Sequence, residues 1–323
     1  SRLIHLKPDT APIFWWLVIC ACVIYGMILL GGVTRLTDSG LSMVDWKPIM
    51  GIIPPLSEND WREMFLKYQQ YPEYKKTNFE MTLSEFKPIF MYEYLHRILG
   101  RIIGIIFFVP LLYFTLRKAI PPVLIPRLYL LLILGGFQGV LGWYMVKSGL
   151  VDDPNVSQYR LTAHLGMAVF IYSLILWTVF DLSLNYDHAI RSRIKWMSST
   201  LTLLIFLMIL SGGLVAGTRA GIPFPTWPLM GDTFIPPHIY SMNPRWLSAF
   251  EDMATIQFNH RMFAYLLTIF IVIFAIVLLR SNVPRFLKNG TTALLFVLSL
   301  QVALGISTLI FYIPIPVAVA HQV

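Results

Sequence analysis

Seven long apolar runs limit what this chain can fold into. They cover residues 12–33, 89–115, 127–146, 161–183, 196–217, 257–279 and 291–313. A helix needs about 20 mostly apolar residues to cross the hydrocarbon core of a bilayer, and every run is long enough. Charged residues make up 13% of the chain, whereas soluble domains contain about 25%. The sequence therefore predicts an all-α polytopic membrane protein.

An eighth apolar run begins near Pro316, and the sequence ends within it at Val323. A stretch this short cannot cross a bilayer. We therefore expect eight transmembrane helices, the last of which is incomplete in this sequence.

The distribution of Lys and Arg predicts the orientation of these helices. Basic residues gather in the segments on one side of the membrane, for example Arg117, Lys118, Arg191, Arg193 and Lys195. Cytoplasmic segments are the ones enriched in Lys and Arg, so the N-terminus is predicted to be cytoplasmic. The two longest loops, 35–88 and 218–256, then lie outside. The formal net charge of +8 follows from this topology, and we do not interpret it as a nucleic-acid-binding surface.

The first outer loop contains signals for two helix starts. Ser57 and Asp60 have capping-box spacing, and an apolar stripe at helical spacing follows them: Trp61, Met64, Phe65 and Tyr68. We expect a short amphipathic helix there that lies on the membrane surface. Thr82 and Glu85 form a second cap, before the helix that carries Glu93.

The two halves of the sequence repeat the same order of elements. Gly31-Gly32 corresponds to Gly212-Gly213, and the segment 138–142 (QGVLG) corresponds to 301–305 (QVALG). Each half has an even number of spans, so both repeats have the same orientation in the membrane. We expect two four-helix bundles, 1–185 and 186–323, related by a pseudo-two-fold axis along the membrane normal.

Four of the seven histidines fall at matching places in this repeat: His96, His164, His260 and His321. Each is predicted to lie near the outer end of its helix, so that the four form two pairs. A single intramembrane histidine can be a polar helix-packing contact, but the repeat favours a ligand role. Two histidines on facing helices of a bundle can bind a haem iron axially, whereas zinc needs a third or fourth ligand.

Charged residues next to the histidines distinguish the halves. Arg97 and Arg261 directly follow a histidine; they are candidates for binding haem propionates or for anchoring to lipid phosphates. Glu93 lies three residues before His96, on the same helix face, where the second half has Gln257. Glu93 forms a salt bridge with Arg97 or supplies a carboxylate to one of two otherwise equivalent haem sites. The second alternative predicts an enzyme.

Several motifs along the whole chain resemble those of the haem A synthase family, in its mitochondrial and proteobacterial branch. They are GGVTRLTDSGLSMVDW at 31–46, EYLHRILGR at 93–101, FQGVLGWYMVKSGL at 137–150, SQYRLTAHLG at 157–166, FNHR at 258–261 and AHQ at 320–322. Some bacterial members have a cysteine pair in the first outer loop. This chain has none there, since its cysteines are Cys20 and Cys22.

The resemblance implies an oxidoreductase that converts the C8 methyl group of haem O to the formyl group of haem A, for assembly of terminal oxidases. His96 and His164 would be the ligands of the substrate haem O, and Glu93 an essential acid. His260 and His321 would hold a haem b cofactor. Two successive hydroxylations would give a geminal diol that loses water to the aldehyde.

The expected location is the bacterial inner membrane, with both haem sites near the periplasmic face. Expected partners are the haem O synthase (protohaem farnesyltransferase), an electron donor and a second copy of the chain. Two other functions stay open at this point. One is a membrane b-type cytochrome that only carries electrons, and the other is a haem or metal transporter. Placing both pairs on one side of the membrane argues against transmembrane electron transfer, and the apolar inner halves of the spans argue against transport.

Overall fold

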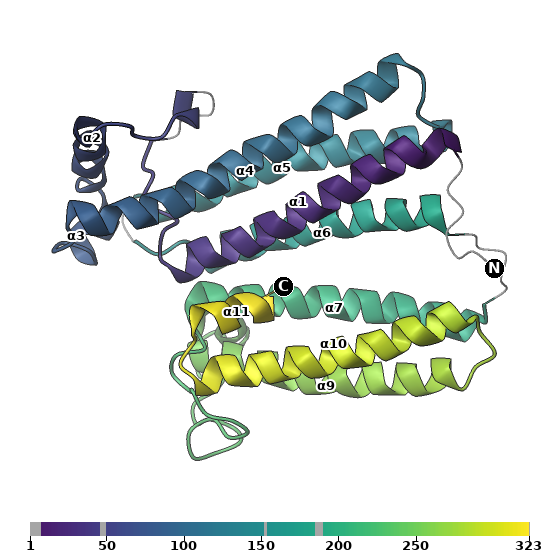
Figure 1. Ribbon diagram of the computed structural model, residues 1–323. Helices are drawn as coiled ribbons and strands as arrows, with labels where there is room; N and C mark the ends of the chain where they lie inside the picture. Colours follow the sequence, from purple (N-terminus) through teal and green to yellow (C-terminus); the bar gives the residue numbers. More distant parts are fainter. Residues whose placement is uncertain (1–7, 46–49, 152–153, 185–189, 323) are drawn as a thin grey trace. The chain divides into compact units, whose positions relative to one another are not determined.

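The computed structural model describes residues 8–45, 50–151, 154–184 and 190–322 (Figure 1). Trp46 of the first motif lies outside these residues. Within them, regular structure is helical apart from one isolated bridge between Met230 and Thr233. The chain divides into two compact units, one ending at Ser183 and one running from Leu184 to Gln322. We describe each unit by itself.

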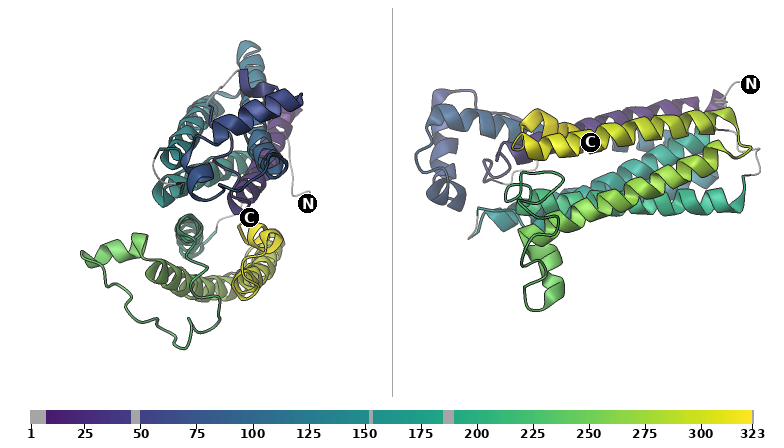
Figure 2. Two further views of the ribbon diagram at one scale, coloured as in Figure 1. Left: turned by 90° about the vertical axis from the view of Figure 1, so that its left-hand side faces the viewer. Right: turned by 90° about the horizontal axis from the view of Figure 1, so that it is seen from below.

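Four long helices form the first unit: α1 (Ala11–Leu36), α4 (Leu83–Leu116), α5 (Ile125–Gly149) and α6 (Gln158–Ser183). Helix α1 packs against α4 and α6, and α5 packs against α6 and α4, so the four helices form a closed bundle (Figure 2). Short elements complete the unit: η1 (Pro8–Thr10), η2 (Met50–Ile52), α2 (Glu58–Tyr68), α3 (Pro72–Lys76) and η3 (Pro122–Leu124).

The second unit contains α7 (Ser192–Thr218), α9 (Met253–Leu279), α10 (Arg285–Ile310) and α11 (Ile315–Gln322). Helix α9 packs against α7 and α10, and α10 also packs against α11. Two short elements, η4 (Arg245–Leu247) and α8 (Ser248–Glu251), precede α9. Helix α11 occupies the place of the predicted eighth span.

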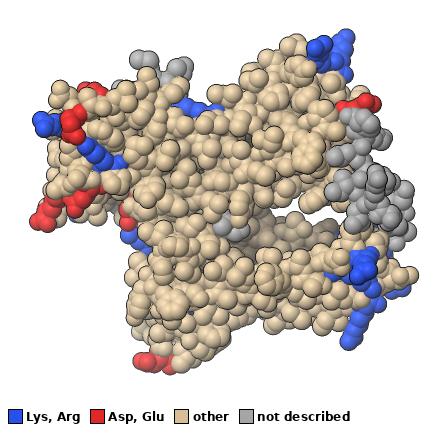
Figure 3. Space-filling view, in the orientation of Figure 1, with Lys and Arg blue, Asp and Glu red and all other residues tan. Residues whose placement is uncertain are grey.

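Seven helices in the described part of the chain are long and apolar enough to cross a membrane, in agreement with the seven predicted runs. Their sides expose large apolar side chains, such as Ile105, Val109 and Ile133. In Figure 3 the charged side chains lie at the helix ends, and the surface between them is uncharged. Because water would not tolerate so much continuous apolar surface, the chain is an all-α integral membrane protein.

Both predicted helix caps are confirmed. The Ser57 hydroxyl accepts a hydrogen bond from the Asp60 N–H at the start of α2, and Thr82 accepts one from the Glu85 N–H at the start of α4. In each cap the acidic side chain also accepts from the backbone of the capping residue. A capping box satisfies backbone donors that a helix start otherwise leaves unpaired, so these four residues fix where α2 and α4 begin.

The predicted amphipathic helix α2 is present, and its apolar stripe packs against α4; its contact with the membrane surface stays a prediction. Trp61, Phe65 and Tyr68 pack against Phe86 and Phe90 at the start of α4, with ring centroids 5.0 to 5.2 Å apart. Helix α4 begins at Leu83, before its apolar run, and its first turns supply the aromatic partners. The stripe therefore fixes the outer loop onto α4.

Large apolar side chains fill one end of each unit. In the first unit, the buried core comprises one face of each long helix: Ile13, Phe14, Trp16, Leu17, Cys20, Ala21 and Ile24 of α1, Phe107 and Leu111 of α4, Ile120, Leu124, Leu128 and Leu131 around the start of α5, and Ile171, Ile175 and Val179 of α6. In the second, it comprises Ile194, Leu201, Leu267, Ile271, Phe274 and Leu278. The histidines and their glycine neighbours belong to the opposite ends of these helices. Each bundle is thus tightly packed at one end and carries its polar groups at the other.

Candidate functional site

The first unit brings His96 of α4 and His164 of α6 together. Their rings are close enough for their charges to interact. Each ring lies against a glycine of a neighbouring helix: a Cβ atom on Gly31 of α1 would be 3.3 Å from His96 Nε2, and one on Gly142 of α5 would be 3.0 Å from His164 Cε1. Both separations are shorter than ordinary contact between carbon or nitrogen atoms. The two glycines therefore provide the space in which the rings lie.

The second unit repeats this arrangement. His260 of α9 and His321 of α11 are also close enough for their charges to interact. A Cβ atom on Gly212 of α7 would be 3.5 Å from His260 Cε1, and one on Gly305 of α10 would be 2.8 Å from His321 Cε1. The structure thus gathers the four predicted histidines into two pairs, each ring facing a glycine at the equivalent position of the repeat.

Two equivalent glutamines hold the second histidine of each pair. Gln138 of α5 donates a hydrogen bond from Nε2 to the backbone carbonyl of His164, at 3.0 Å. Gln301 of α10 donates one to the carbonyl of His321, at 2.6 Å. A hydrogen bond from a side-chain amide to the backbone of a neighbouring helix fixes the position of one helix along the other. The glutamine and the glycine four residues later therefore position the histidine together.

The histidine pairs have the properties that haem ligation requires. All four rings are half-buried. The Nδ1 atoms of His164 and His321 are buried without a hydrogen-bond partner among the described residues, which leaves part of their polar capacity unused. Within that same part of the chain, no group of three or more His, Cys, Asp or Glu is arranged to hold a metal ion. The donor set in each unit is a pair of imidazoles, which fits two axial ligands of a haem.

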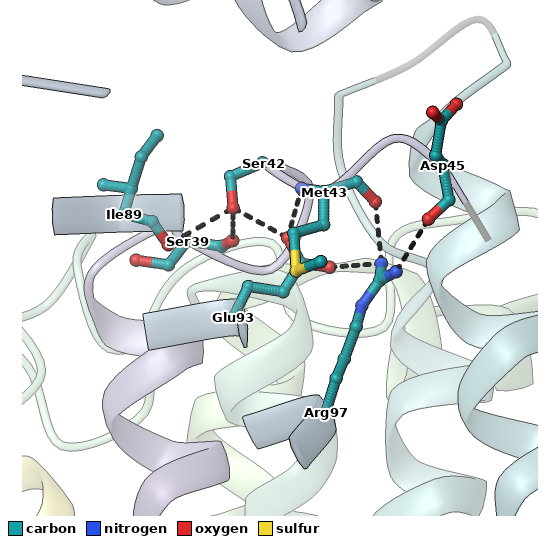
Figure 4. A network of polar contacts seen from close by, with 7 residues as sticks. All are labelled: Ser39, Ser42, Met43, Asp45, Ile89, Glu93 and Arg97. Atoms are coloured by element: carbon teal, nitrogen blue, oxygen red, sulfur yellow. Dashed lines mark hydrogen bonds and ion pairs between the residues drawn. The ribbon is translucent and has the colours of Figure 1, made fainter. Parts of the chain in front are cut away.

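Glu93, three residues before His96, is buried, and both of its carboxylate oxygens accept hydrogen bonds in the network that Figure 4 shows. Its exposed fraction is 3%. One carboxylate oxygen accepts hydrogen bonds from the Ser42 hydroxyl at 2.8 Å and the Met43 N–H at 2.6 Å. The other accepts from Arg97, at 2.5 Å. Arg97 donates further to the backbone carbonyls of Met43 and Asp45, at 2.7 and 3.1 Å.

The predicted salt bridge between Glu93 and Arg97 is therefore present, and it lies within a larger network. The Ser42 oxygen also lies within hydrogen-bond distance of the carbonyls of Ser39 and Ile89, at 2.8 and 3.2 Å, as alternative acceptors for its single O–H. A buried carboxylate is stable only where donors compensate for lost hydration, and here three groups donate to it. Glu93 and Arg97 thus fasten the segment after α1 to α4.

The second unit has a neutral version of this network. Arg261 donates to the carbonyls of Phe224 and Leu229, at 3.0 and 3.3 Å. It also donates to the side-chain oxygen of Gln257, at 3.2 Å, and Gln257 donates to Phe224 at 3.3 Å. Arg97 and Arg261 therefore have the same role toward the loop that follows the first helix of their unit. The binding of haem propionates by Arg97 and Arg261 stays a prediction.

The loop over the first site is itself anchored by buried polar groups. The Tyr68 hydroxyl donates to the Glu73 carboxylate at 3.0 Å and accepts from the Asn78 amide at 2.8 Å. Tyr68 and Glu73 are both buried. Burial raises the pKa of the Tyr68 phenol, and the negative charge of Glu73 adds to this shift. The phenol stays protonated and remains a hydrogen-bond donor.

Sequence reasoning missed one contact at the histidines. The Ser211 hydroxyl of α7 lies 3.0 Å from Nδ1 of His260. Ser211 directly precedes the glycine pair at 212–213, and a serine inside an apolar helix is common enough that its position alone gave no signal. Only the packing of α7 against α9 identifies its partner.

Known proteins resemble the chain over nearly its whole length. Residues 14–323 match the COX15-CtaA family, described as "Cytochrome oxidase assembly protein". A "Heme A synthase" of Nitrosospira multiformis is 48% identical over 316 residues, which cover 96% of this chain and 88% of that protein. Proteins of the same name from Parvibaculum lavamentivorans and Wolbachia pipientis wMel are 43% and 38% identical, over 96% and 98% of this chain and 89% of each relative. The chain therefore belongs to the haem A synthase family of cytochrome oxidase assembly proteins.

Proposed function

We propose that this protein is a haem A synthase, an oxidoreductase that converts the C8 methyl group of haem O to a formyl group. The observation that carries the proposal is the repeated pair of histidines, each ring against a glycine. This arrangement supplies two bis-imidazole sites in one chain, as an enzyme with one haem substrate and one haem cofactor requires. The names of the relatives support the same activity.

We assign the substrate haem O to the first unit and haem b to the second. His96 and His164 would be the ligands of the substrate. His260 and His321 would hold haem b, which supplies one-electron redox chemistry when bound. The assignment rests on the asymmetry one turn before the first histidine of each pair, where the first unit has a carboxylate and the second an amide. A reaction at a methyl group needs proton transfer, and a carboxylate beside the substrate is the more suitable group.

In this proposal the C8 methyl group undergoes two hydroxylations, each a two-electron oxidation that takes up one oxygen atom and requires an oxidant from outside the chain. The resulting geminal diol loses water to give the aldehyde. Glu93 holds or moves a proton at its carboxylate oxygens, or its negative charge stabilises a cationic intermediate of the substrate. Arg97 keeps that carboxylate in place through their ion pair. The hydrogen bonds from Ser42 and Met43 orient its other oxygen.

We further propose that the protein lies in the bacterial inner membrane with a cytoplasmic N-terminus and both sites near the periplasmic face. The excess of Lys and Arg on the opposite side supports this orientation. Haem O would come from the haem O synthase, and an electron donor would serve the haem b site. A homo-oligomer is compatible with the exposed apolar helix sides.

Pyridine haemochrome analysis of the purified protein, with mass identification of the extracted haems, tests the proposal. We expect haem b together with haem O, its hydroxylated form or haem A. Haem b alone, at two per chain, would overturn the enzyme assignment and favour a b-type cytochrome that only carries electrons.

A further inference from the structure

The first histidines of the two pairs, His96 and His260, differ in their contacts. His260 Nδ1 lies 3.0 Å from the Ser211 hydroxyl, within hydrogen-bond distance. Gly212, the next residue of α7, faces the same ring at Cε1. A Cβ atom on Gly212 would reach ordinary van der Waals contact with the ring, at 3.5 Å, and the hydroxyl of the preceding residue lies within hydrogen-bond distance of it.

The first unit has no hydroxyl at the corresponding place. The repeat aligns Gly31-Gly32 with Gly212-Gly213, so that Leu30 corresponds to Ser211. Gly31 faces His96 on its Nε2 side, and Gly212 faces His260 on its Cε1 side. A leucine side chain neither donates nor accepts a hydrogen bond. The glycine is therefore common to both units, and the hydroxyl is specific to the second.

We propose that Ser211 is a positioning residue for the haem b ligand His260. If His260 binds iron through Nε2, its Nδ1 carries the proton and donates to the Ser211 oxygen. This contact fixes the tautomer and ring orientation and makes the ring a stronger electron donor. A stronger donor favours the ferric over the ferrous iron, so the contact lowers the reduction potential. The inference rests on the proposed assignment of haem b to this unit.

The difference suits two haems with different fates. A resident cofactor benefits from a ligand held in one orientation, because its potential must stay constant over many turnovers. A substrate haem has to leave after oxidation, so an additional hold on its ligand would oppose release. Leu30 at the place of Ser211 is consistent with that requirement.

The test is a redox titration of the resident haem b in the purified full-length protein, with electron paramagnetic resonance of the ferric state. Ser211→Ala is expected to shift the midpoint potential to a more positive value and to change the g values. Ser211→Thr restores the hydroxyl and is expected to return both toward the wild type. Thr202→Ala is the matched control, because Thr202 belongs to the same helix and its hydroxyl donates to the carbonyl of Ser198 one turn earlier.

A second pair of variants covers a loss of haem from Ser211→Ala. Ser211→Thr and Ser211→Val have nearly the same shape and differ in the hydroxyl. Equal potentials and g values in these two variants, or a wild-type potential in Ser211→Ala, would overturn the inference. A wild-type protein without haem b would instead overturn the proposed function, and a His260→Ala variant with an unchanged haem b spectrum would overturn the assignment of haem b to this unit.

Discussion

The two units carry the same histidine and glycine framework but surround it with different polar groups. In the first, buried Glu93 makes an ion pair with Arg97. In the second, neutral Gln257 takes that place beside Arg261. Conversely, the second unit has a hydroxyl at His260, where the first has Leu30. The shared residues are those that create space and donor pairs, and the differing residues are those that set charge and ligand orientation.

This contrast separates haem binding from reaction chemistry. Axial binding of a haem needs two imidazoles, and each unit brings two histidines together as candidate ligands. Reaction at a substrate needs a group that carries charge or moves protons, and only the first unit has a carboxylate at the equivalent position. Arg97 and Arg261 do not distinguish the two units, since each donates to backbone carbonyls of the loop after the first helix of its unit.

The largest effect is expected from removing one histidine, which breaks the equivalence of the two histidine pairs. His260→Ala is expected to abolish binding of the proposed haem b, because that haem would lose one of its two histidine ligands. The measurement is the low-spin haem b spectrum and the haem-to-protein ratio. His96→Ala is the matched variant and is expected to keep haem b while losing bound haem O. If His260→Ala retained haem b and His96→Ala lost it, the two assignments would be exchanged.

Glu93→Gln is expected to stop haem A formation while leaving the haem b spectrum intact. An amide has one acceptor oxygen, but Arg97 and the Met43 N–H both donate to the carboxylate. The amide NH₂ must therefore face a donor, which costs about 1–3 kcal/mol on top of the lost charge. The assay is conversion of haem O, followed by mass identification of the product.

A control separates the charge of Glu93 from the network it holds. Ser42→Ala removes one hydrogen bond to the same carboxylate and leaves its charge and the ion pair. We expect this variant to retain most of the conversion. Undiminished conversion by Glu93→Gln would exclude a catalytic role, and equal loss in both variants would show that the loop geometry alone matters.

Gly305→Ala is expected to disturb the second site without removing a ligand. Its new Cβ atom would lie 2.8 Å from His321 Cε1, so the ring has to move. The expected result is a broadened or high-spin haem b spectrum with partial haem loss. Gly290→Ala, in the same helix and with no atom near the added Cβ, is the control and is expected to resemble the wild type. A normal spectrum for Gly305→Ala would show that the ring position does not depend on this glycine.

The sequence predicted those features that depend on pattern. Apolar runs of sufficient length predicted the seven spans, and short capping motifs predicted the starts of α2 and α4. The repeat predicted that His96 would meet His164, and that His260 would meet His321. Their ligation of haem stays a prediction.

Contacts that depend on three-dimensional neighbours were not predictable. Arg97 and Arg261 donate to backbone carbonyls. Every residue has such a carbonyl, so the sequence does not indicate which ones the arginines reach. The partner of Ser211 is known only once α7 and α9 pack together. For the α2 stripe, periodicity identified the apolar face but not its partner, which is the set of aromatic residues that begins α4.

The smallest expected effect concerns the outer loop of the first unit, which has an aromatic core of its own. Tyr68→Phe removes the hydroxyl that donates to Glu73 and accepts from Asn78. Losing a donor to a buried carboxylate costs about 1–3 kcal/mol, and this cost falls on the loop rather than on either histidine pair. We expect faster proteolysis within residues 50–82, with the haem b spectrum unchanged. Tyr74→Phe, whose hydroxyl accepts only from the Gln69 amide, should have a smaller effect. The framework of each unit, taken alone, predicts that the loop of the first unit and the haem site of the second are independent. A change in the haem b spectrum of Tyr68→Phe would show instead that they are coupled.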